Sequence, residues 1–222
     1  MAEFIAHRGN FGKARENTLE AFLSCKDHGV YGVELDVRRS ADGALVVFHD
    51  PEIAGLGQIS ELDLVELPEW LPRLDEVLDI APPMFVNIEI KNDPRESCYD
   101  ESGELSHNVC TTIQMRPGLK CLVSSFDIAT IDCVKSEYPE VNTGFLSYIS
   151  GDEVLDIVVS HGHNSVNLHY GNIDLATVLK AHELGIDVFA WTVDDPKGVE
   201  EMIGMGVDYI ITNKVEDCLS RY

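Results

Sequence analysis

Residues 32–37 read GVELDV, and residues 86–91 read VNIEIK. Both stretches alternate aliphatic with polar side chains, which is the period of a β-strand, whose successive side chains point to opposite faces. The aliphatic residues of each stretch therefore share one face, while Glu34 and Asp36 share the other face of the first strand and Glu89 has the same orientation in the second. We expect the aliphatic face to pack against helices and the acidic face to point to the axis of a barrel.

Short β-branched runs of this kind recur along the whole chain and alternate with longer amphipathic stretches, which is the pattern of repeated β-α units around a parallel sheet. The strand candidates are residues 4–7, 32–37, 85–91, 120–124, 142–147, 164–168, 186–193 and 207–212. The helix candidates are residues 18–28, 74–80, 106–115, 128–137, 152–161, 174–184, 196–205 and a last turn from residue 215. Eight strands with eight helices predict the α/β class and a TIM (β/α)8 barrel.

Two segments interrupt this regular alternation. Residues 41–44 are a turn signal, and residues 45–48 read as a strand-like return that delivers His49. Residues 92–105 form a loop after the third strand. Since no linker, fixed-period repeat or low-complexity tract occurs, we predict a single domain over residues 1–222, with a short strand-like hairpin after the second strand.

The composition fits a soluble globular protein of moderate size. A length of 222 residues with 45% hydrophobic residues fills one core without a second domain. We expect a cytoplasmic protein, because the chain has no charged leader with an apolar run and no stretch of ~18 apolar residues. The six cysteines lack a CxxC pair and are expected to be thiols.

A net charge of −23 argues against nucleic acid and against stable membrane association, because anionic partners would be repelled. A substrate that carries phosphate would need a local positive centre. A cation held by some of the carboxylates would supply it. The sequence gives no indication of the oligomeric state.

Three carboxylates are expected at the carboxyl ends of neighbouring strands, namely Glu34, Asp36 and Glu89. A group of like charges is costly to keep ionised unless a cation neutralises it. Their oxygens suit one divalent cation, Mg²⁺ or Ca²⁺, with Mn²⁺ as a third candidate. The competing interpretation is a structural salt-bridge network with Lys91 and Arg8, but three acids exceed what two bases would stabilise.

Two histidines follow strands at the same end of the predicted barrel. His7 ends the first strand and His49 ends the hairpin, and imidazole titrates near neutrality, so the pair is predicted to serve as acid and base. Arg8 and Lys91 are candidate phosphate ligands. The other histidines are interpreted as structural: 28, 107, 161, 163, 169 and 182.

Short blocks with these residues follow one another from the first strand to the last: His7-Arg8-Gly9, Glu16-Asn17-Thr18, Glu34-Leu35-Asp36, His49-Asp50, Glu89-Ile90-Lys91, Ser125-Phe126, Trp191-Thr192-Val193 and Ile211-Thr212-Asn213. Together they resemble the glycerophosphodiester phosphodiesterases over essentially the whole chain. Each block alone is weak, but the set in this order is specific.

The resemblance implies a barrel enzyme that hydrolyses a glycerophosphodiester to glycerol 3-phosphate and an alcohol. It implies Glu34, Asp36 and Glu89 as metal ligands and the two histidines as the acid/base pair. It also implies that Phe126 and Trp191 line the apolar side of the glycerol site, although both could equally be core residues. The implied reaction begins with attack of the substrate's neighbouring hydroxyl on phosphorus and passes through a cyclic phosphate.

The chain departs from many members of this family after the His-Asp block. A long insertion with a hydroxyl- and base-rich start is common there, whereas only residues 51–73 precede the next helix here. The surface that selects the alcohol half of the substrate is therefore not predicted by the resemblance.

Three other functions compete with this one. An aldolase would use Lys91 as a Schiff-base former, but it would leave the carboxylates and histidines without a shared task. A lipid-directed phosphodiesterase of the phosphatidylinositol phospholipase C or sphingomyelinase D type would share the barrel, but no basic patch or exposed apolar helix for docking is evident. A non-catalytic phosphoester-binding barrel is the third alternative.

Overall fold

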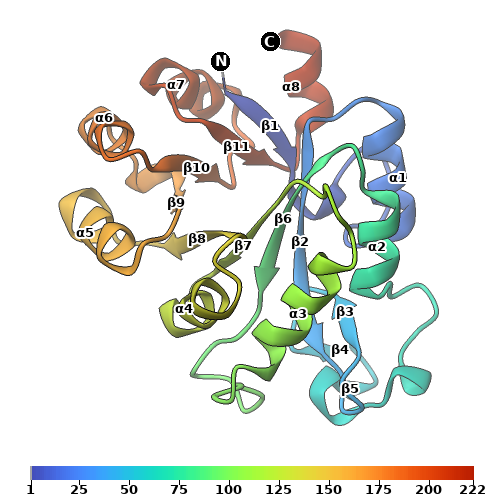
Figure 1. Cartoon of the computed structure of the whole chain (residues 1–222). Coiled ribbons are helices and arrows are strands. Elements are labelled where there is room, and N and C mark those ends of the chain that lie inside the picture. The colour runs from blue at the N-terminus through green and yellow to red at the C-terminus, as the bar shows by residue number, and fades with distance from the viewer. Residues whose placement is uncertain (1) are drawn as a thin grey trace.

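The computed structural model describes residues 2–222, and within them eight parallel strands form one closed sheet (Figure 1). The barrel strands are β1 (Glu3–Ala6), β2 (Gly32–Arg39), β6 (Phe85–Ile90), β7 (Cys121–Ser125), β8 (Asn142–Ser147), β9 (Ser165–His169), β10 (Asp187–Trp191) and β11 (Tyr209–Thr212). β1 pairs in parallel with both β11 and β2, which closes the ring. The predicted TIM barrel is confirmed.

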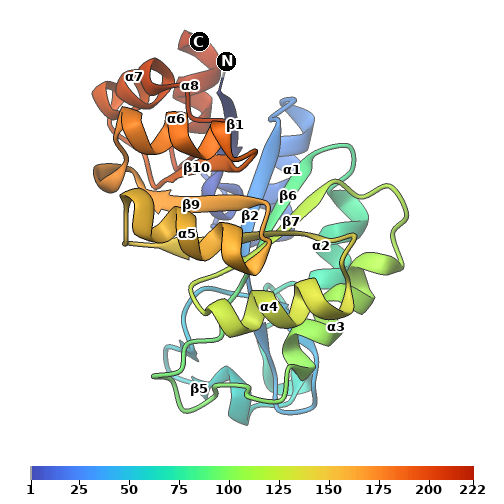
Figure 2. The ribbon, with the colours of Figure 1, turned by 60° about the vertical axis from the view of Figure 1, so that its left-hand side comes forward.

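A helix lies between successive barrel strands, and the helices cover the outside of the barrel (Figure 2). They are α1 (Leu19–Asp27), α2 (Leu74–Ile80), α3 (Glu104–Gln114), α4 (Ile128–Glu137), α5 (Gly151–His161), α6 (Leu175–Glu183), α7 (Pro196–Met205) and α8 (Val215–Arg221). The side chains of Asp127, Asp174 and Asp195 accept hydrogen bonds from the first turns of α4, α6 and α7, so local capping fixes where these helices begin.

The two faces of each barrel strand pack against different partners. Val33, Leu35 and Val37 are buried in the layer between the sheet and the helices. Inside the ring, an apolar cluster of Ile5, Leu122, Phe189 and Ile211 includes Phe85 and Tyr209, the first residues of β6 and β11. Apolar side chains therefore fill the amino end of the barrel interior.

The segment after β2 forms a small lobe beyond the carboxyl end of that strand (Figure 1). Its first strand, β3 (Leu45–Val47), runs antiparallel to β2, with Val47 opposite Val37. The short strands β4 (Glu52–Ile53) and β5 (Gly57–Gln58) form a separate two-stranded sheet. The predicted strand-like hairpin after the second strand is confirmed.

Within residues 2–222, no helix combines the length and the apolar character that a membrane crossing requires. All six cysteines are free thiols, as predicted.

A tight turn follows β1 at the carboxyl end of the barrel. This turn requires a glycine. Gly9 has a φ of +69°, and a Cβ added there would lie 2.7 Å from a ring carbon of Phe22. The residue before it, Arg8, also has a left-handed backbone, with a φ of 54°. This turn therefore depends on the missing side chain of Gly9 for both its conformation and its packing.

We expect Gly9→Ala to lower the free energy of unfolding by about 2–4 kcal/mol, because backbone strain and a clash with Phe22 add together. Gly12→Ala is the matched control, since Gly12 has a φ of +67° but no atom within 4 Å of the added Cβ. The control should cost only about 1 kcal/mol. Urea unfolding of both variants measures the difference, and equal losses would contradict a packing role for Gly9.

Candidate active site

The carboxyl ends of the strands surround a cavity of about 240 Å³. Residues of three kinds line it: acids and bases from the first strands, two histidines, and aromatic side chains from the opposite wall. They include His7, Arg8, Glu34, His49, Glu89, Lys91, Phe126, Tyr148 and Trp191. Asp36 lies beside the cavity and contacts Arg8 and Lys91. The structure thus brings together all nine site residues predicted from the sequence.

Asp36 is the best-neutralised acid of the group. Its Oδ1 lies 3.1 Å from Lys91 Nζ, and its Oδ2 lies 3.3 Å from Arg8 Nε. Asn17, which has a left-handed backbone with a φ of 55°, donates from Nδ2 to the same Oδ2 at 2.9 Å. Burial alone would raise the pKa of Asp36, but Lys91 and Arg8 outweigh it and hold that pKa below its usual range.

Glu34 and Glu89 are less well neutralised. Lys91 Nζ donates to Glu89 Oε1 at 2.6 Å. Burial raises the pKa of Glu89 although Lys91 opposes the shift. Glu34 accepts the backbone N–H of Arg8 on Oε2 at 2.9 Å, while its Oε1 is buried and has no partner. Burial, followed by repulsion from Asp36 and Glu89, raises the pKa of Glu34 well above its usual range.

The three carboxylates fit a divalent cation. One oxygen from each of Glu34, Asp36 and Glu89 lies within 4.8 Å of the other two, and all three residues are buried. Lys91 and Arg8 neutralise two acids and leave the third with a buried oxygen that lacks a partner. The three carboxylates carry one negative charge more than Lys91 and Arg8 balance, and all the potential ligand atoms are oxygens. Such a site suits Mg²⁺ or Ca²⁺ better than a softer metal.

A chain of hydrogen bonds holds His7. It connects the ends of β1 and β11, the two strands that close the barrel. Its Nδ1 lies 2.8 Å from Oδ1 of Asn213, the residue after β11, and the amide of Asn213 donates to Asp194 at 2.7 Å. Asp194 fixes the amide orientation, so Oδ1 accepts the proton of Nδ1 and Nε2 of His7 is left as an acceptor. Burial, then Arg8, lowers the pKa of His7, which favours the neutral base.

His49 lies on the other side of the carboxylates. Its Nδ1 is 2.7 Å from Oδ1 of Asp50, and its side chain is 39% exposed. The buried side chain of Arg38 donates from Nε to the carbonyl oxygen of His49 at 2.8 Å and from Nη1 to Glu96 at 2.7 Å. Arg38 therefore connects β2, the His49 turn and the loop after β6, and it positions His49 without touching the cavity of the acids.

Aromatic side chains form the wall opposite the acids. Trp191 contacts Phe126 edge to face at a centroid distance of 5.5 Å and Tyr148 at 5.2 Å. Phe126 is 42% exposed and Tyr148 is 65% exposed. The indole Nε1 of Trp191 is buried and has no hydrogen-bond partner. This wall offers both apolar surface and a free donor.

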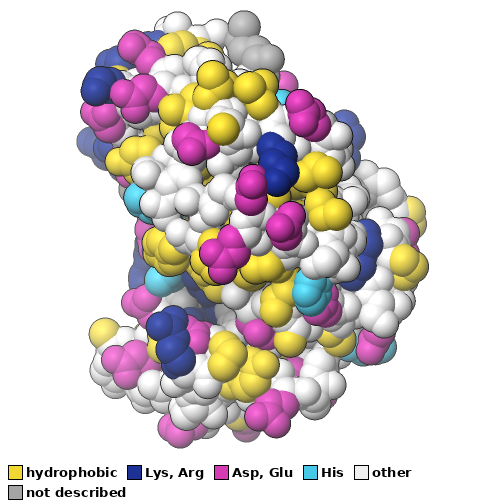
Figure 3. Space-filling view, turned by 90° about the vertical axis from the view of Figure 1, so that its left-hand side faces the viewer, with side chains coloured by type: hydrophobic (Ala, Val, Ile, Leu, Met, Phe, Trp, Pro, Cys, Tyr) yellow, Lys and Arg dark blue, Asp and Glu magenta, His cyan; other side chains and the backbone are white. Residues whose placement is uncertain are grey.

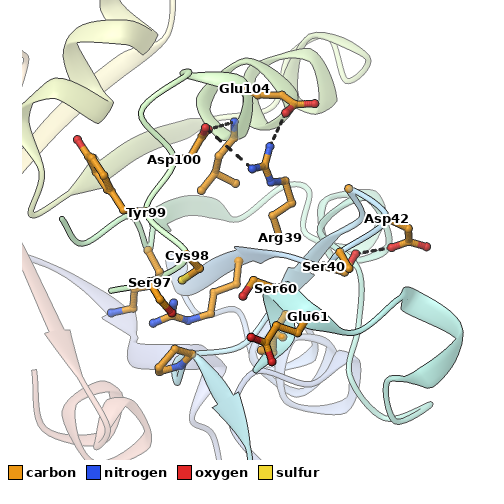
Figure 4. Close-up of a pocket in the computed structure, with 17 residues that line it drawn as sticks. Arg39, Ser40, Asp42, Ser60, Glu61, Ser97, Cys98, Tyr99, Asp100 and Glu104 are labelled. Carbon is orange, nitrogen blue, oxygen red and sulfur yellow. Dashed lines mark hydrogen bonds and ion pairs between the residues drawn. The ribbon is translucent and has the colours of Figure 1, made fainter. Parts of the chain in front are cut away.

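Two further hollows adjoin this cavity. One of about 560 Å³ shares His49, Glu89, Lys91, Phe126 and Tyr148 with the cavity. The other, of about 670 Å³, lies between the small lobe and the loop after β6 (Figure 4). Lys91 lines all three spaces. Both hollows therefore share at least one wall residue with the cavity beside the carboxylates.

The hollow in Figure 4 is not arranged for catalysis. Arg39 reaches Glu104 at 2.7 Å and Asp100 at 3.9 Å, and Ser40 donates to Asp42 at 2.6 Å (Figure 4). Because Arg39 is paired with two acids of this hollow, it is not free to bind a substrate phosphate.

The chain has many more acidic than basic residues. On the face shown in Figure 3, acidic side chains are spread among apolar and uncharged ones, and the face is notched at one side, where basic and histidine side chains lie. Arg8 and Lys91, by contrast, lie inside the site with side chains 18% and 14% exposed. Two positive side chains therefore stand inside the site in spite of the net charge of −23, although the three carboxylates outnumber them.

Sequence reasoning missed several residues that shape the site: Asn17, Arg38, Tyr148, Asp194 and Asn213. Asn17 and Asn213 stand in the quoted blocks Glu16-Asn17-Thr18 and Ile211-Thr212-Asn213, and their positions beside strand ends were the available signal. Arg38 follows Asp36 on the same face of β2, so its inward orientation could also have been found. No local pattern marks Tyr148 or Asp194.

A family model described as the glycerophosphoryl diester phosphodiesterase family matches residues 7–217. Among curated relatives, a glycerophosphodiester phosphodiesterase of Caldanaerobacter subterraneus subsp. tengcongensis is 30% identical over 236 residues, which cover 97% of this chain and 96% of the relative. A glycerophosphodiester phosphodiesterase of Bacillus altitudinis is 26% identical, with 96% and 95% covered.

Solved structures have the same fold. The chain superposes on a glycerophosphodiester phosphodiesterase from Thermotoga maritima with a TM-score of 0.84 and 28% identity, covering 100% of this chain and 99% of the other. A phosphodiesterase from Oleispira antarctica, solved in complex with the product sn-glycerol-3-phosphate, gives a TM-score of 0.88 at 24% identity, with 98% and 95% covered.

We expect Glu89→Gln to weaken binding of Ca²⁺ by about tenfold or more, because the site loses one of three ionised oxygen ligands. His49→Ala should change the affinity by less than about twofold, since imidazole is not a ligand in this arrangement. Isothermal titration calorimetry measures both, with Glu52→Gln on the exposed part of the small lobe as the control. An equal loss of metal in the Glu89 and His49 variants would show that the imidazole is a ligand.

Proposed function

This chain belongs to the glycerophosphoryl diester phosphodiesterase family, and from that premise we propose that its barrel-mouth site hydrolyses glycerophosphodiesters to glycerol 3-phosphate and an alcohol by histidine acid–base catalysis. The enzyme is a phosphoric diester hydrolase with glycerophosphodiester phosphodiesterase activity. The product found in the Oleispira antarctica neighbour supports the proposed product.

One observation carries the proposal. Three buried carboxylates, two bases and two histidines converge on a single cavity at the carboxyl ends of the strands. Barrel enzymes carry out their reactions at this end. A phosphodiester requires stabilisation of negative charge and transfer of two protons, and this set of groups supplies both.

In the proposed enzyme Glu34, Asp36 and Glu89 hold one divalent cation, Mg²⁺ or Ca²⁺, with Mn²⁺ as a further candidate. When bound, the ion neutralises charge that builds on the phosphoryl oxygens. Arg8 and Lys91, which lie beside the three carboxylates, bind the phosphate group of the substrate. Burial would lower the pKa of Lys91, but Glu89 and Asp36 outweigh it and raise that pKa, so the side chain remains an ammonium ion. That argues against the Schiff-base chemistry of an aldolase.

In the first step the C2 hydroxyl of the glycerol attacks phosphorus and gives its proton to Nε2 of His7. The bond between phosphorus and the alcohol oxygen breaks, and His49 donates a proton to the leaving alkoxide. The product of this step is a five-membered cyclic phosphate and the free alcohol. Asp50 orients His49 through Nδ1, as Asn213 orients His7.

In the second step water attacks phosphorus and gives its proton to His49, which is now neutral. The bond between phosphorus and the C2 oxygen breaks, and His7 returns its proton to that oxygen. Both histidines recover their starting forms. Phe126 and Trp191 pack against the carbon skeleton of the glycerol, and the free Nε1 of Trp191 donates to one of its oxygens.

The leaving alcohol extends, in this proposal, along the 560 Å³ hollow beyond His49. Residues 1–222 act as one domain, which the single closed barrel supports. The partner is a small glycerophosphodiester. Neither nucleic acid nor a stable membrane contact is part of the proposed function, because the net charge of −23 repels both.

The direct test is release of glycerol 3-phosphate from glycerophosphocholine. Activity should disappear after treatment with a chelator and return with Mg²⁺ or Ca²⁺, while borohydride should trap no adduct on Lys91. Full activity in metal-free protein would overturn the proposed role of the carboxylates.

A lipid-directed phosphodiesterase is the second candidate, and the exposed rings of Phe126 and Tyr148 at the rim of the site favour it. Lysophosphatidylcholine, as monomers and in vesicles, separates the two functions. Faster cleavage of the vesicle-bound lipid than of glycerophosphocholine would favour the lipid substrate.

We expect a glycerophosphocholine analogue that lacks the C2 hydroxyl to be inert, because the attacking oxygen is missing, while an analogue that lacks the C1 hydroxyl is still cleaved. Phosphorus NMR during turnover of the natural substrate should detect a cyclic phosphate. Cleavage of the C2-deoxy analogue at a normal rate would show that water attacks the diester directly.

Asn213→Ala should lower kcat by about tenfold or more and leave KM nearly unchanged, because His7 loses the acceptor that fixes its tautomer. Asn142→Ala, an exposed asparagine at the opposite end of the barrel, is the control. Steady-state kinetics and the unfolding midpoint are measured together. A loss of stability without a fall in kcat would assign Asn213 a structural role only.

A further inference from the structure

A second cluster of metal-binding side chains lies at the amino end of the barrel, away from the site described above. Asp132 belongs to α4, His161 is the last residue of α5, and His163 precedes β9. α4 and α5 are successive helices on the outside of the barrel (Figure 2). Donor atoms of the three residues lie within 4.8 Å of one another.

His163 is built into this cluster in an unusual way. Its side chain is 0% exposed, and Nδ1 lies 2.9 Å from Oγ1 of Thr143, the second residue of β8. Its Nε2 lies 3.2 Å from Oδ1 of Asp132 but makes no hydrogen bond, because the contact is not aligned for one. A fully buried ring nitrogen therefore faces Asp132 across the cluster without an aligned hydrogen bond, which is costly unless a ligand satisfies it.

The other two donors surround that nitrogen. Nδ1 of His161 lies 2.9 Å from both carboxylate oxygens of Asp132. The rings of His161 and His163 are stacked at a centroid distance of 6.0 Å and an interplanar angle of 13°. Gly162, with a φ of +75°, turns the chain so that both imidazoles face Asp132.

We propose that Asp132, His161 and His163 form a second metal site, which binds a Zn²⁺-class ion and braces α4 against the turn between α5 and β9. Neighbouring ligands in a tetrahedral zinc site lie roughly 3.3 Å apart, given bonds of about 2.0 Å. Two of the three separations, 2.9 and 3.2 Å, are close to that value, and the third lies within 4.8 Å. The side chains of Asp132 and His161 are 38% and 40% exposed, so an ion can enter from solvent and water can complete the coordination.

The donor chemistry distinguishes this site from the carboxylate cluster. Two imidazoles with one carboxylate suit Zn²⁺, Co²⁺ or Ni²⁺, whereas three carboxylates suit Mg²⁺ or Ca²⁺. Thr143 holds the far nitrogen of His163, as outer partners of metal-bound histidines commonly do. Because the amino end of such barrels serves stability more than catalysis, the role of the ion is structural.

Other histidines in the described chain pair with a carboxylate but lack a third ligand of this kind. His182 lies 3.0 Å from Asp208, and His107 lies 3.0 Å from Glu137. Neither pair belongs to a three-ligand group within residues 2–222. His182 therefore provides a matched control with the same histidine–aspartate contact.

The test is titration of the full chain with ZnCl₂ in saturating Mg²⁺, which occupies the oxygen site. We expect one equivalent of Zn²⁺ to bind and to raise Tm by about 5–10 °C at a hundredfold excess over Kd. His161→Gln and Asp132→Asn, both on the exposed side, should each weaken Zn²⁺ binding at least tenfold and abolish the rise in Tm. Both should still release glycerol 3-phosphate at the normal rate. His182→Gln should bind Zn²⁺ as the unmodified chain does.

Co²⁺ in place of Zn²⁺ provides a second measurement, because its visible absorption reports nitrogen ligation in a tetrahedral site. The spectrum should be lost in His161→Gln and kept in His182→Gln. The proposal is overturned if no Zn²⁺ binds in the presence of Mg²⁺, if His161→Gln and Asp132→Asn bind as tightly as the unmodified chain, or if His182→Gln loses as much affinity as they do.

Discussion

The burial of three carboxylates at the mouth of one barrel is the constraint around which the site is organised. Glu34, Asp36 and Glu89 are buried on neighbouring strands. Two basic side chains, Lys91 and Arg8, contact this group. Repulsion among buried like charges is unfavourable unless each oxygen has a donor or an ion. Glu34 receives one such donor from the backbone. Arg8 has a left-handed conformation, and its N–H donates a hydrogen bond to the Glu34 carboxylate.

The barrel makes this arrangement tolerable because its interior changes character along the axis. At the amino end the rings of Phe85, Phe189 and Tyr209 pack against one another and exclude water. At the carboxyl end the same inward-facing rows carry acids, which can be reached from the cavity. The apolar side chains at the amino end stabilise the closed ring of strands. The polar side chains at the carboxyl end are therefore not needed for folding and can serve binding.

The sequence predicted the parts of this structure that depend on local periodicity. The alternation in residues 32–37 and 86–91 placed the acids on one face, and the same reasoning located the eight strands within a few residues. Contacts that depend on ring closure carry no such signal. His7 and Asn213 are 206 positions apart and meet only because β1 pairs with β11. The ion pair of Arg38 with Glu96 likewise follows from how the loop after β6 folds over the small lobe.

Burial and pairing, more than residue type, also separate the histidines of the proposed metal site from those in ordinary surface pairs. Sequence reasoning assigned His161 and His163 to the structural group because they lie on a helix and a loop late in the chain. Their environment differs from that of His182, which forms an ordinary exposed pair with Asp208. His163 is enclosed, held on one nitrogen by Thr143, while the other nitrogen faces Asp132 without an aligned hydrogen bond. The spacing His161-Gly162-His163 predicts neither the burial of the His163 ring nor the hydrogen bond that its Nε2 lacks. Both features become visible only in the folded structure.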